Sequence, residues 1–141
     1  MSEIIAVDFD GTIVEHAYPQ IGKPKLFAFE TLKELQKQGY RLILWTYRAG
    51  KELDEAVEFC RNNGVEFYAV NKNYPEEEFD SSISRKINAD IYIDDRNLGG
   101  FPGWSEVWKM LNPKVYNSIS EDENDSTTPG FLNRLFKKNR K

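Results

Sequence analysis

The segment that most constrains the fold is residues 4–12, where an apolar stretch passes directly into the sequence DFDGT. Its first four residues are all apolar, which predicts a strand buried on both faces. Asp8 and Asp10 follow at positions i and i+2, so in extended chain their side chains point the same way. Gly11 then permits a sharp bend. Two carboxylates this close repel each other unless a cation or a shared proton offsets the charge. The segment therefore indicates a metal site, a catalytic pair or both.

Predicted strands and helices alternate along the rest of the chain. Short apolar runs predict strands, apolar residues at three- and four-residue spacing predict helices, and glycines mark several ends. The expected strands are 3–9, 41–46, 66–70 and 89–93, and the expected helices are 26–38, 51–63 and 104–111. This order predicts an α/β domain with a mainly parallel sheet covered by helices.

Polar side chains follow three of the predicted strands. The first ends in Asp8 and Asp10, the second in Thr46, and the fourth in Asp94 and Asp95. Right-handed crossovers place the carboxyl ends of parallel strands along one edge, which is where such sheets bind ligands. Four carboxylates and a hydroxyl are therefore expected at one edge of the sheet.

These residues resemble the four motifs of the haloacid dehalogenase (HAD) superfamily. The motifs correspond to residues 8–12, Thr46, Lys86 and the pair 94–95, in the same order along the chain. More narrowly, the chain is similar to small bacterial HAD hydrolases that carry WTYR and IDDRNLGG segments. The resemblance implies a Rossmannoid three-layer domain with helices on both faces of the sheet. It also implies no large cap domain, because residues 13–25 and 71–86 are too few to fold as a lid.

The resemblance further implies a Mg²⁺-dependent phosphomonoester hydrolase. Asp8 would attack phosphorus and form an aspartyl-phosphate intermediate, while Asp10 would act as general acid and then general base. Mg²⁺ would be held by the Asp8 carboxylate, the main-chain carbonyl of Asp10 and a carboxylate of the 94–95 pair. Asp95 is the preferred direct ligand and Asp94 the second choice.

The remaining site residues would contact the phosphoryl group. By the same resemblance, Thr46 donates its hydroxyl to a phosphoryl oxygen, and Lys86 neutralises the charge of Asp8 and the phosphoryl group. The neighbouring Arg85 and the more distant Lys72 are alternatives for this cation.

Four more residues are expected to bind substrate. Main-chain amides around Gly11 and Thr12 are expected to help hold phosphate, as successive N–H groups in turns do. Arg48 and Arg96 are expected to contact substrate, with an ordinary surface or ion-pair arginine as the alternative for each. His16, the only histidine, is interpreted as a partly exposed loop residue, with a substrate contact as the alternative.

Composition narrows the class of protein. A chain of 141 residues allows one domain with a real core, and the formal net charge of −4 gives no general attraction to nucleic acid or anionic membranes. Cys60 is the only cysteine, so an internal disulfide or a cysteine-based zinc cluster is excluded. No signal sequence or membrane-spanning run is recognisable, which makes a cytoplasmic protein the expectation.

The organisation of the chain leaves the substrate and partners open. Residues 1–116 are expected to form the hydrolase domain, 117–129 an acidic flexible linker, and 130–141 a basic amphipathic tail. The tail would dock a partner or a surface, or else simply fray or pack on the domain. The substrate would be a nucleotide, a polynucleotide end or a sugar phosphate, without a stable nucleic-acid complex. A non-catalytic phosphate-binding or regulatory module on the same fold is the alternative function.

Overall fold

The computed structural model describes residues 2–121, which contain four strands and four helices. In chain order these are β1 (Ile4–Val7), α1 (Ala28–Lys37), β2 (Arg41–Leu44), α2 (Gly50–Asn62), β3 (Ala69–Val70), β4 (Ile91–Ile93), α3 (Trp104–Leu111) and α4 (Pro113–Glu121). The chain divides into two compact units, Met1–Phe101 and a second unit that begins at Pro102, and each is described by itself. Within residues 2–121, each helix is too short or too polar to cross a membrane.

The first unit is built on a parallel sheet with the strand order β3-β2-β1-β4. β1 lies between β2 and β4, and Val7 pairs with Leu44 on one side and Ile93 on the other. The carboxyl ends of these three strands are therefore level with one another. The sheet confirms the predicted α/β class with parallel strands, and it brings the segments after Val7, Leu44 and Ile93 to one edge.

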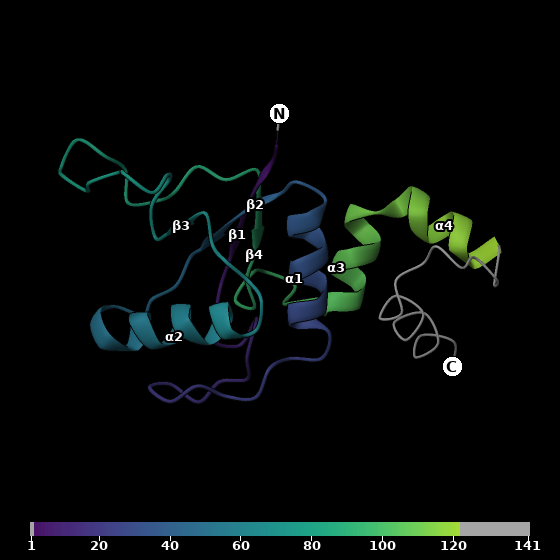
Figure 1. Ribbon diagram of the computed structural model, residues 1–141, viewed down its shortest axis with the longest axis horizontal. Coiled ribbons are helices and arrows are strands. Elements are labelled where there is room, and N and C mark those ends of the chain that lie inside the picture. The colour runs from purple at the N-terminus through teal and green to yellow at the C-terminus, as the bar shows by residue number, and fades with distance from the viewer. Residues whose placement is uncertain (1, 122–141) are drawn as a thin grey trace. The chain divides into compact units, whose positions relative to one another are not determined.

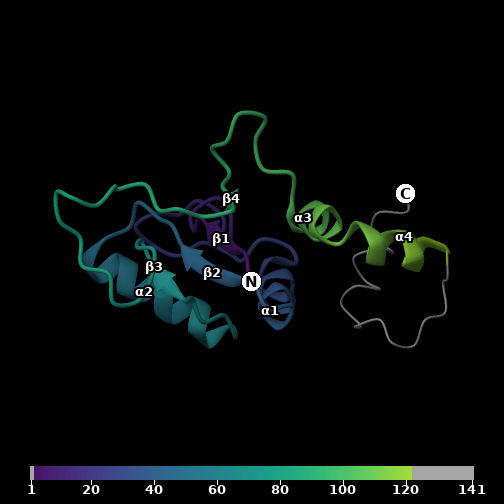
Figure 2. The same ribbon diagram turned by 90° about the horizontal axis from the view of Figure 1, so that it is seen from above.

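Helices α1 and α2, which are labelled in Figure 1, lie on the same side of the sheet in Figure 2. This follows from topology, because right-handed crossovers from β1 to β2 and from β2 to β3 move in one direction and so use one face. Buried side chains of both helices, including Leu32 and Leu35 of α1 and Cys60 of α2, contribute to the core. Burial raises the pKa of the Cys60 thiol to about 12, as is typical of an unreactive cysteine packed in a core.

The opposite face of the sheet is covered by an irregular segment instead of a helix. Ala6, Ile43 and Ala69 of the sheet form a buried cluster with Ile87, which lies in the segment between β3 and β4. Figure 2 shows this segment passing on the side of the sheet away from α1 and α2. Within the first unit, the structure therefore differs from the expectation of helices on both faces. The connection from β3 to β4 is polar and lacks the apolar spacing that predicts a helix.

Element boundaries differ from the predicted ones by a few residues. α1 begins at Ala28 instead of residue 26 because Phe27 adopts a left-handed conformation with φ 65°. β3 is a two-residue edge strand, shorter than the predicted 66–70. α4 was not predicted, and its Glu121 end shows that residues 117–121 are helical instead of part of a flexible linker. The predicted tail, 130–141, lies outside the described residues.

Candidate active site

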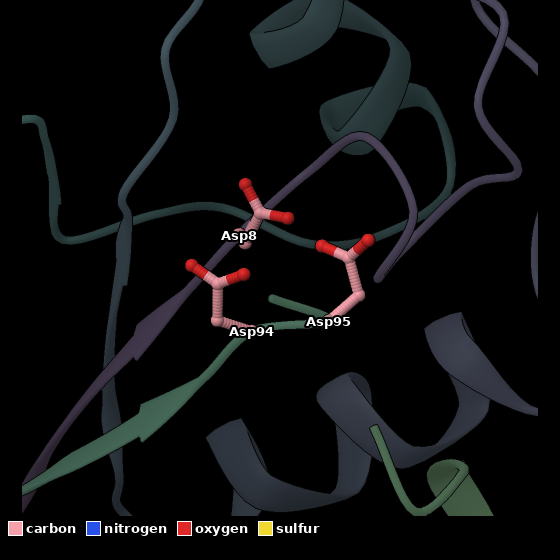
Figure 3. Close-up of side chains that lie close together, drawn as sticks. All are labelled: Asp8, Asp94 and Asp95. Atoms are coloured by element: carbon pink, nitrogen blue, oxygen red, sulfur yellow. The ribbon is translucent and has the colours of Figure 1, made fainter. Parts of the chain in front are cut away.

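Three aspartates meet at the carboxyl edge of the sheet. One carboxylate oxygen from each of Asp8, Asp94 and Asp95 lies within 4.8 Å of the other two. Figure 3 shows the three side chains close together beyond the ends of β1 and β4. Each is partly buried, so water screens their mutual repulsion incompletely. All three residues were predicted for this site from the ends of the first and fourth strands.

The end of β4 explains why two adjacent aspartates reach the same point. Neighbouring residues of a strand point to opposite faces, but β4 ends at Ile93 and the chain turns immediately afterwards. The main-chain amide of Asp8 donates to the carbonyl oxygen of Ile93 at 2.9 Å, which keeps the two strand ends in register. Asp94 and Asp95 are thereby both free to approach Asp8.

The turn after β1 links two of these carboxylates. The buried hydroxyl of Thr12 donates to Oδ2 of Asp8 at 2.9 Å and accepts from the main-chain amide of Asp95, also at 2.9 Å. Gly11 has φ 86°, and a Cβ there would overlap the side chains of Asp95 and His16. Thr12 therefore holds Asp8 and Asp95 in place, and the absence of a side chain at Gly11 leaves room for Asp95 and His16.

The expected phosphate-binding role of Gly11 and Thr12 is not supported by these contacts. The amide of Gly11 donates to the carbonyl of Val14 at 2.7 Å, and the amide of Thr12 donates to that of Phe9 at 3.2 Å. Both amides are used to close the turn, and the Thr12 hydroxyl is used on carboxylates. The sequence alone could not show that the carbonyls of Val14 and Phe9 accept from these amides, so the amides were expected to bind phosphate.

His16 lies at the edge of the carboxylate cluster. Its Nε2 is 2.9 Å from Oδ2 of Asp95, and its side chain is 52% exposed. His16 is a partly exposed loop residue, as expected from the sequence. It also lines a cavity, so the alternative of a substrate contact stays a prediction. Its contact with Asp95 was not predicted, since the two residues are far apart in the sequence.

Two carboxyl groups of the cluster have pKa values shifted in opposite directions. Burial raises the pKa of Asp8 to about 8, and a hydrogen bond with Asp95 and the negative charge of Asp94 add to this effect. Burial acts in the same direction on Asp95, but its hydrogen bonds with His16 and Asp8 hold the pKa of Asp95 below its usual value. Asp8 therefore retains a proton near neutral pH in the cation-free protein.

Asp10 is not one of these three clustered carboxylates and instead forms an ion pair with Arg48. The guanidinium donates from Nε to Oδ2 of Asp10 at 2.7 Å and from Nη2 to Oδ1 at 2.8 Å. The Asp10 carboxylate raises the pKa of Arg48 above its already high value. The side chain of Arg48 is fully buried in this contact, so the structure shows the ion-pair arginine that was the alternative interpretation of this residue.

Thr46 is held at the end of β2 by main-chain contacts. Its amide donates to Oδ1 of Asn71 at 2.8 Å, and its hydroxyl accepts from the amide of Arg48 at 3.2 Å. The hydroxyl proton of Thr46 remains available to a ligand in the cavity. Asn71 was missed by sequence reasoning, although an asparagine directly after a strand is a signal for the left-handed conformation that it adopts, with φ 53°.

A cavity of about 680 Å³ opens beside the carboxylates. It lies at the carboxyl edge of the sheet, and its walls carry acidic, aromatic and basic side chains. The lining residues are Asp8, Asp10, His16, Tyr18, Trp45, Thr46, Tyr47, Asp94 and Arg96.

Arg96, predicted as a substrate contact, and Lys86, predicted as the phosphate-neutralising cation, lie in different surroundings. Arg96 lines the cavity, and its guanidinium has no hydrogen bond or ion pair with any of residues 2–121. Lys86 is exposed, with its Nζ 5.3 Å from the centre of the Tyr92 ring, and it is absent from the cavity lining within the same residues. The structure therefore brings Arg96, but not Lys86, to the predicted site.

The donor set fits a hard divalent cation. Three carboxylates supply only oxygen ligands, and their proximity is electrostatically costly without a cation. Asp8, Asp94 and Asp95 are the residues that would hold such an ion. The main-chain carbonyl of Asp10, expected from the sequence as a further ligand, stays a prediction.

Comparison with solved structures finds a protein of similar sequence and fold. The chain is similar to a conserved protein from Bacteroides thetaiotaomicron, with 57% sequence identity and a TM-score of 0.76. The match covers 81% of this chain and 93% of the other. Neither a family model nor a curated protein matches the sequence.

Proposed function

The chain belongs to the same family as the conserved Bacteroides thetaiotaomicron protein, and we propose that it is a Mg²⁺-dependent phosphomonoester hydrolase of the HAD type. The observation that carries the proposal is the meeting of Asp8, Asp94 and Asp95 beside a cavity that Asp8 and Asp94 line. A carboxylate nucleophile beside two further carboxylates suits chemistry at a phosphoryl group that a divalent cation also contacts.

In this mechanism Asp8 is the nucleophile, and Asp10 is the general acid and then the general base. A carboxylate oxygen of Asp8 forms a bond to phosphorus as the bond to the leaving oxygen breaks, and Asp10 gives that oxygen a proton. Water then attacks phosphorus and gives a proton to Asp10. The bond from phosphorus to Asp8 breaks, inorganic phosphate leaves, and both carboxyl groups return to their starting states.

Other residues would stabilise the charge that moves during these steps. Mg²⁺, held by Asp8, Asp94 and Asp95, would supply positive charge that favours ionised Asp8 and polarises a phosphoryl oxygen. We assign the Thr46 hydroxyl to one phosphoryl oxygen. We assign to Arg96 the charge-neutralising role that the resemblance implies for Lys86, because Arg96 lines the cavity and its guanidinium has no hydrogen bond or ion pair with residues 2–121.

A phosphatase screen tests the proposal. Purified protein is assayed with Mg²⁺ against nucleotides, sugar phosphates and 3′-phosphorylated oligonucleotides, with and without EDTA. We expect hydrolysis of at least one class, reversible loss with EDTA, and loss of turnover in Asp8→Asn. Asp54→Asn, a matched change on the exposed surface of α2, should keep full activity. Full activity of Asp8→Asn or in EDTA would contradict the proposal.

A non-catalytic phosphate-binding or regulatory module is the second candidate. One observation favours it, which is that Lys86 does not line the cavity within residues 2–121. Beryllium fluoride with Mg²⁺ separates the two candidates because it mimics a phosphoryl group on a carboxylate. Binding that requires Asp8, combined with no turnover of any substrate, would favour the module.

A further inference from the structure

Arg48 is the most completely bonded side chain near the candidate site. A guanidinium has five N–H donors, and each nitrogen of Arg48 is used. Nε and Nη2 bind the two oxygens of Asp10, Nη2 also binds the carbonyl of Gln20 at 2.7 Å, and Nη1 binds the carbonyls of Pro19 at 3.0 Å and Glu52 at 3.4 Å. The guanidinium is therefore fixed by contacts with three separate parts of the chain.

Aromatic rings add to this constraint. The guanidinium carbon of Arg48 lies 5.1 Å from the centre of the Phe9 ring and 5.2 Å from that of Tyr18. With its side chain fully buried, Arg48 cannot turn toward the cavity without breaking these contacts. It holds the Asp10 carboxylate by a two-point contact, which fixes rotation about the side chain as well as position.

We propose that Arg48 is a positioning residue that aims the Asp10 carboxylate at the leaving oxygen of the substrate. The inference rests on the proposed function, because it assigns Arg48 a part in the proton transfer of Asp10. Each carboxylate oxygen has two lone pairs, so Asp10 can bind Arg48 on one side and exchange a proton on the side that lines the cavity. Misplacement of a reacting group by about 1 Å can cost about 100-fold in rate.

The dependence of kcat/KM on the leaving group distinguishes a positioning role of Arg48 from a purely structural one. A structural role would lower kcat/KM equally for good and poor leaving groups. An alkoxide needs a proton to depart, whereas 4-nitrophenolate departs readily without one. The ratio kcat/KM reports the steps through departure of the leaving group. If Arg48 acts through Asp10, Arg48→Met should lower kcat/KM about 100-fold for an alkyl phosphate and less than about 10-fold for 4-nitrophenyl phosphate.

Two further variants keep the test informative. Arg48→Lys preserves the charge but cannot make the two-point contact, so it should show the same preference for the good leaving group while remaining folded. In an Asp10→Asn background, Arg48→Met should lower alkyl phosphate hydrolysis by less than about twofold, because the group that it positions is already gone. Arg61→Met, on the exposed surface of α2, is the matched control and should behave as wild type.

The outcomes separate this inference from the proposed function. No hydrolysis by the wild-type protein would overturn the function itself. With an active wild type, an equal loss on both substrates in the folded Arg48→Lys protein would overturn the positioning role. Additive losses of Arg48→Met and Asp10→Asn would overturn it as well. Thermal unfolding of each variant identifies any that fails to fold.

Discussion

Thr12 connects the carboxylates of the candidate site. Its hydroxyl contacts Asp8 and the main-chain amide of Asp95, so it fixes two of the three groups that would hold a cation. Thr12→Val removes the hydroxyl with little change in shape, and it should weaken Mg²⁺ affinity by about 10- to 100-fold. Isothermal titration calorimetry measures this change. Thr12→Ser, which keeps the hydroxyl, should bind Mg²⁺ nearly as wild type. Equal affinity in the valine variant would contradict the assigned role.

The raised pKa of Asp8 predicts how stability depends on pH. Folded Asp8 holds a proton up to about pH 8, whereas in the unfolded chain its pKa is near 3.8. Between these values the folded state binds more protons, so the free energy of unfolding should fall as pH rises from about 4 to about 8. Urea unfolding in EDTA measures this slope. Asp8→Asn should lack this component, and identical pH profiles for the two proteins would contradict it.

At the scale of residues, the sequence predicted the acidic groups but not their hydrogen-bond partners. Asp8, Asp94 and Asp95 could be predicted because each directly follows a strand with a clear apolar pattern. The ion pair between Arg48 and Asp10 could not be predicted, because the two residues are 38 positions apart in the sequence. In addition, the sequence around a buried arginine does not differ recognisably from that around an exposed one.

At the scale of elements, Asn71 joins the ends of β2 and β3. Its amide donates to the carbonyl of Leu44, and its side chain accepts from the amide of Thr46, both at 2.8 Å. Asn71→Gly keeps the left-handed backbone accessible but loses the side-chain contact, so it should cost about 1 kcal/mol of unfolding free energy.

Asn71→Ala loses the contact and also strains the backbone at φ 53°. It should therefore be less stable than the glycine variant by about 1 kcal/mol. Denaturant unfolding compares the two proteins. Equal stability would show that the left-handed conformation contributes nothing to this junction.

The elements themselves were largely predictable, and their ends were less so. Apolar periodicity located the four strands and α1–α3 because buried faces leave a repeating pattern. It did not locate α4, which begins with Pro113 and continues into residues with the polar composition of a linker. The resemblance to the HAD superfamily implied helices on both faces of the sheet, whereas the packing of Ile87 shows that an irregular segment can bury one face.

At the scale of the whole molecule, the first unit is a small α/β domain with its candidate site at the open edge of the sheet. The segment between β1 and α1 and the segment between β3 and β4 contain no helix within residues 2–121, so neither forms a cap domain. A site without a cap admits large substrates and excludes less water. Discrimination among phosphorylated substrates would then depend on the residues of the rim, including Tyr18, Tyr47 and Arg96.

Detection of an acyl phosphate on Asp8 would establish whether this residue is the nucleophile. The protein would be quenched in acid during turnover with Mg²⁺, reduced with borohydride and examined by peptide mass spectrometry. Borohydride converts an aspartyl phosphate to homoserine, so we expect homoserine at residue 8, and none in protein quenched without substrate. Steady turnover with unmodified Asp8, or with homoserine at another aspartate, would contradict it.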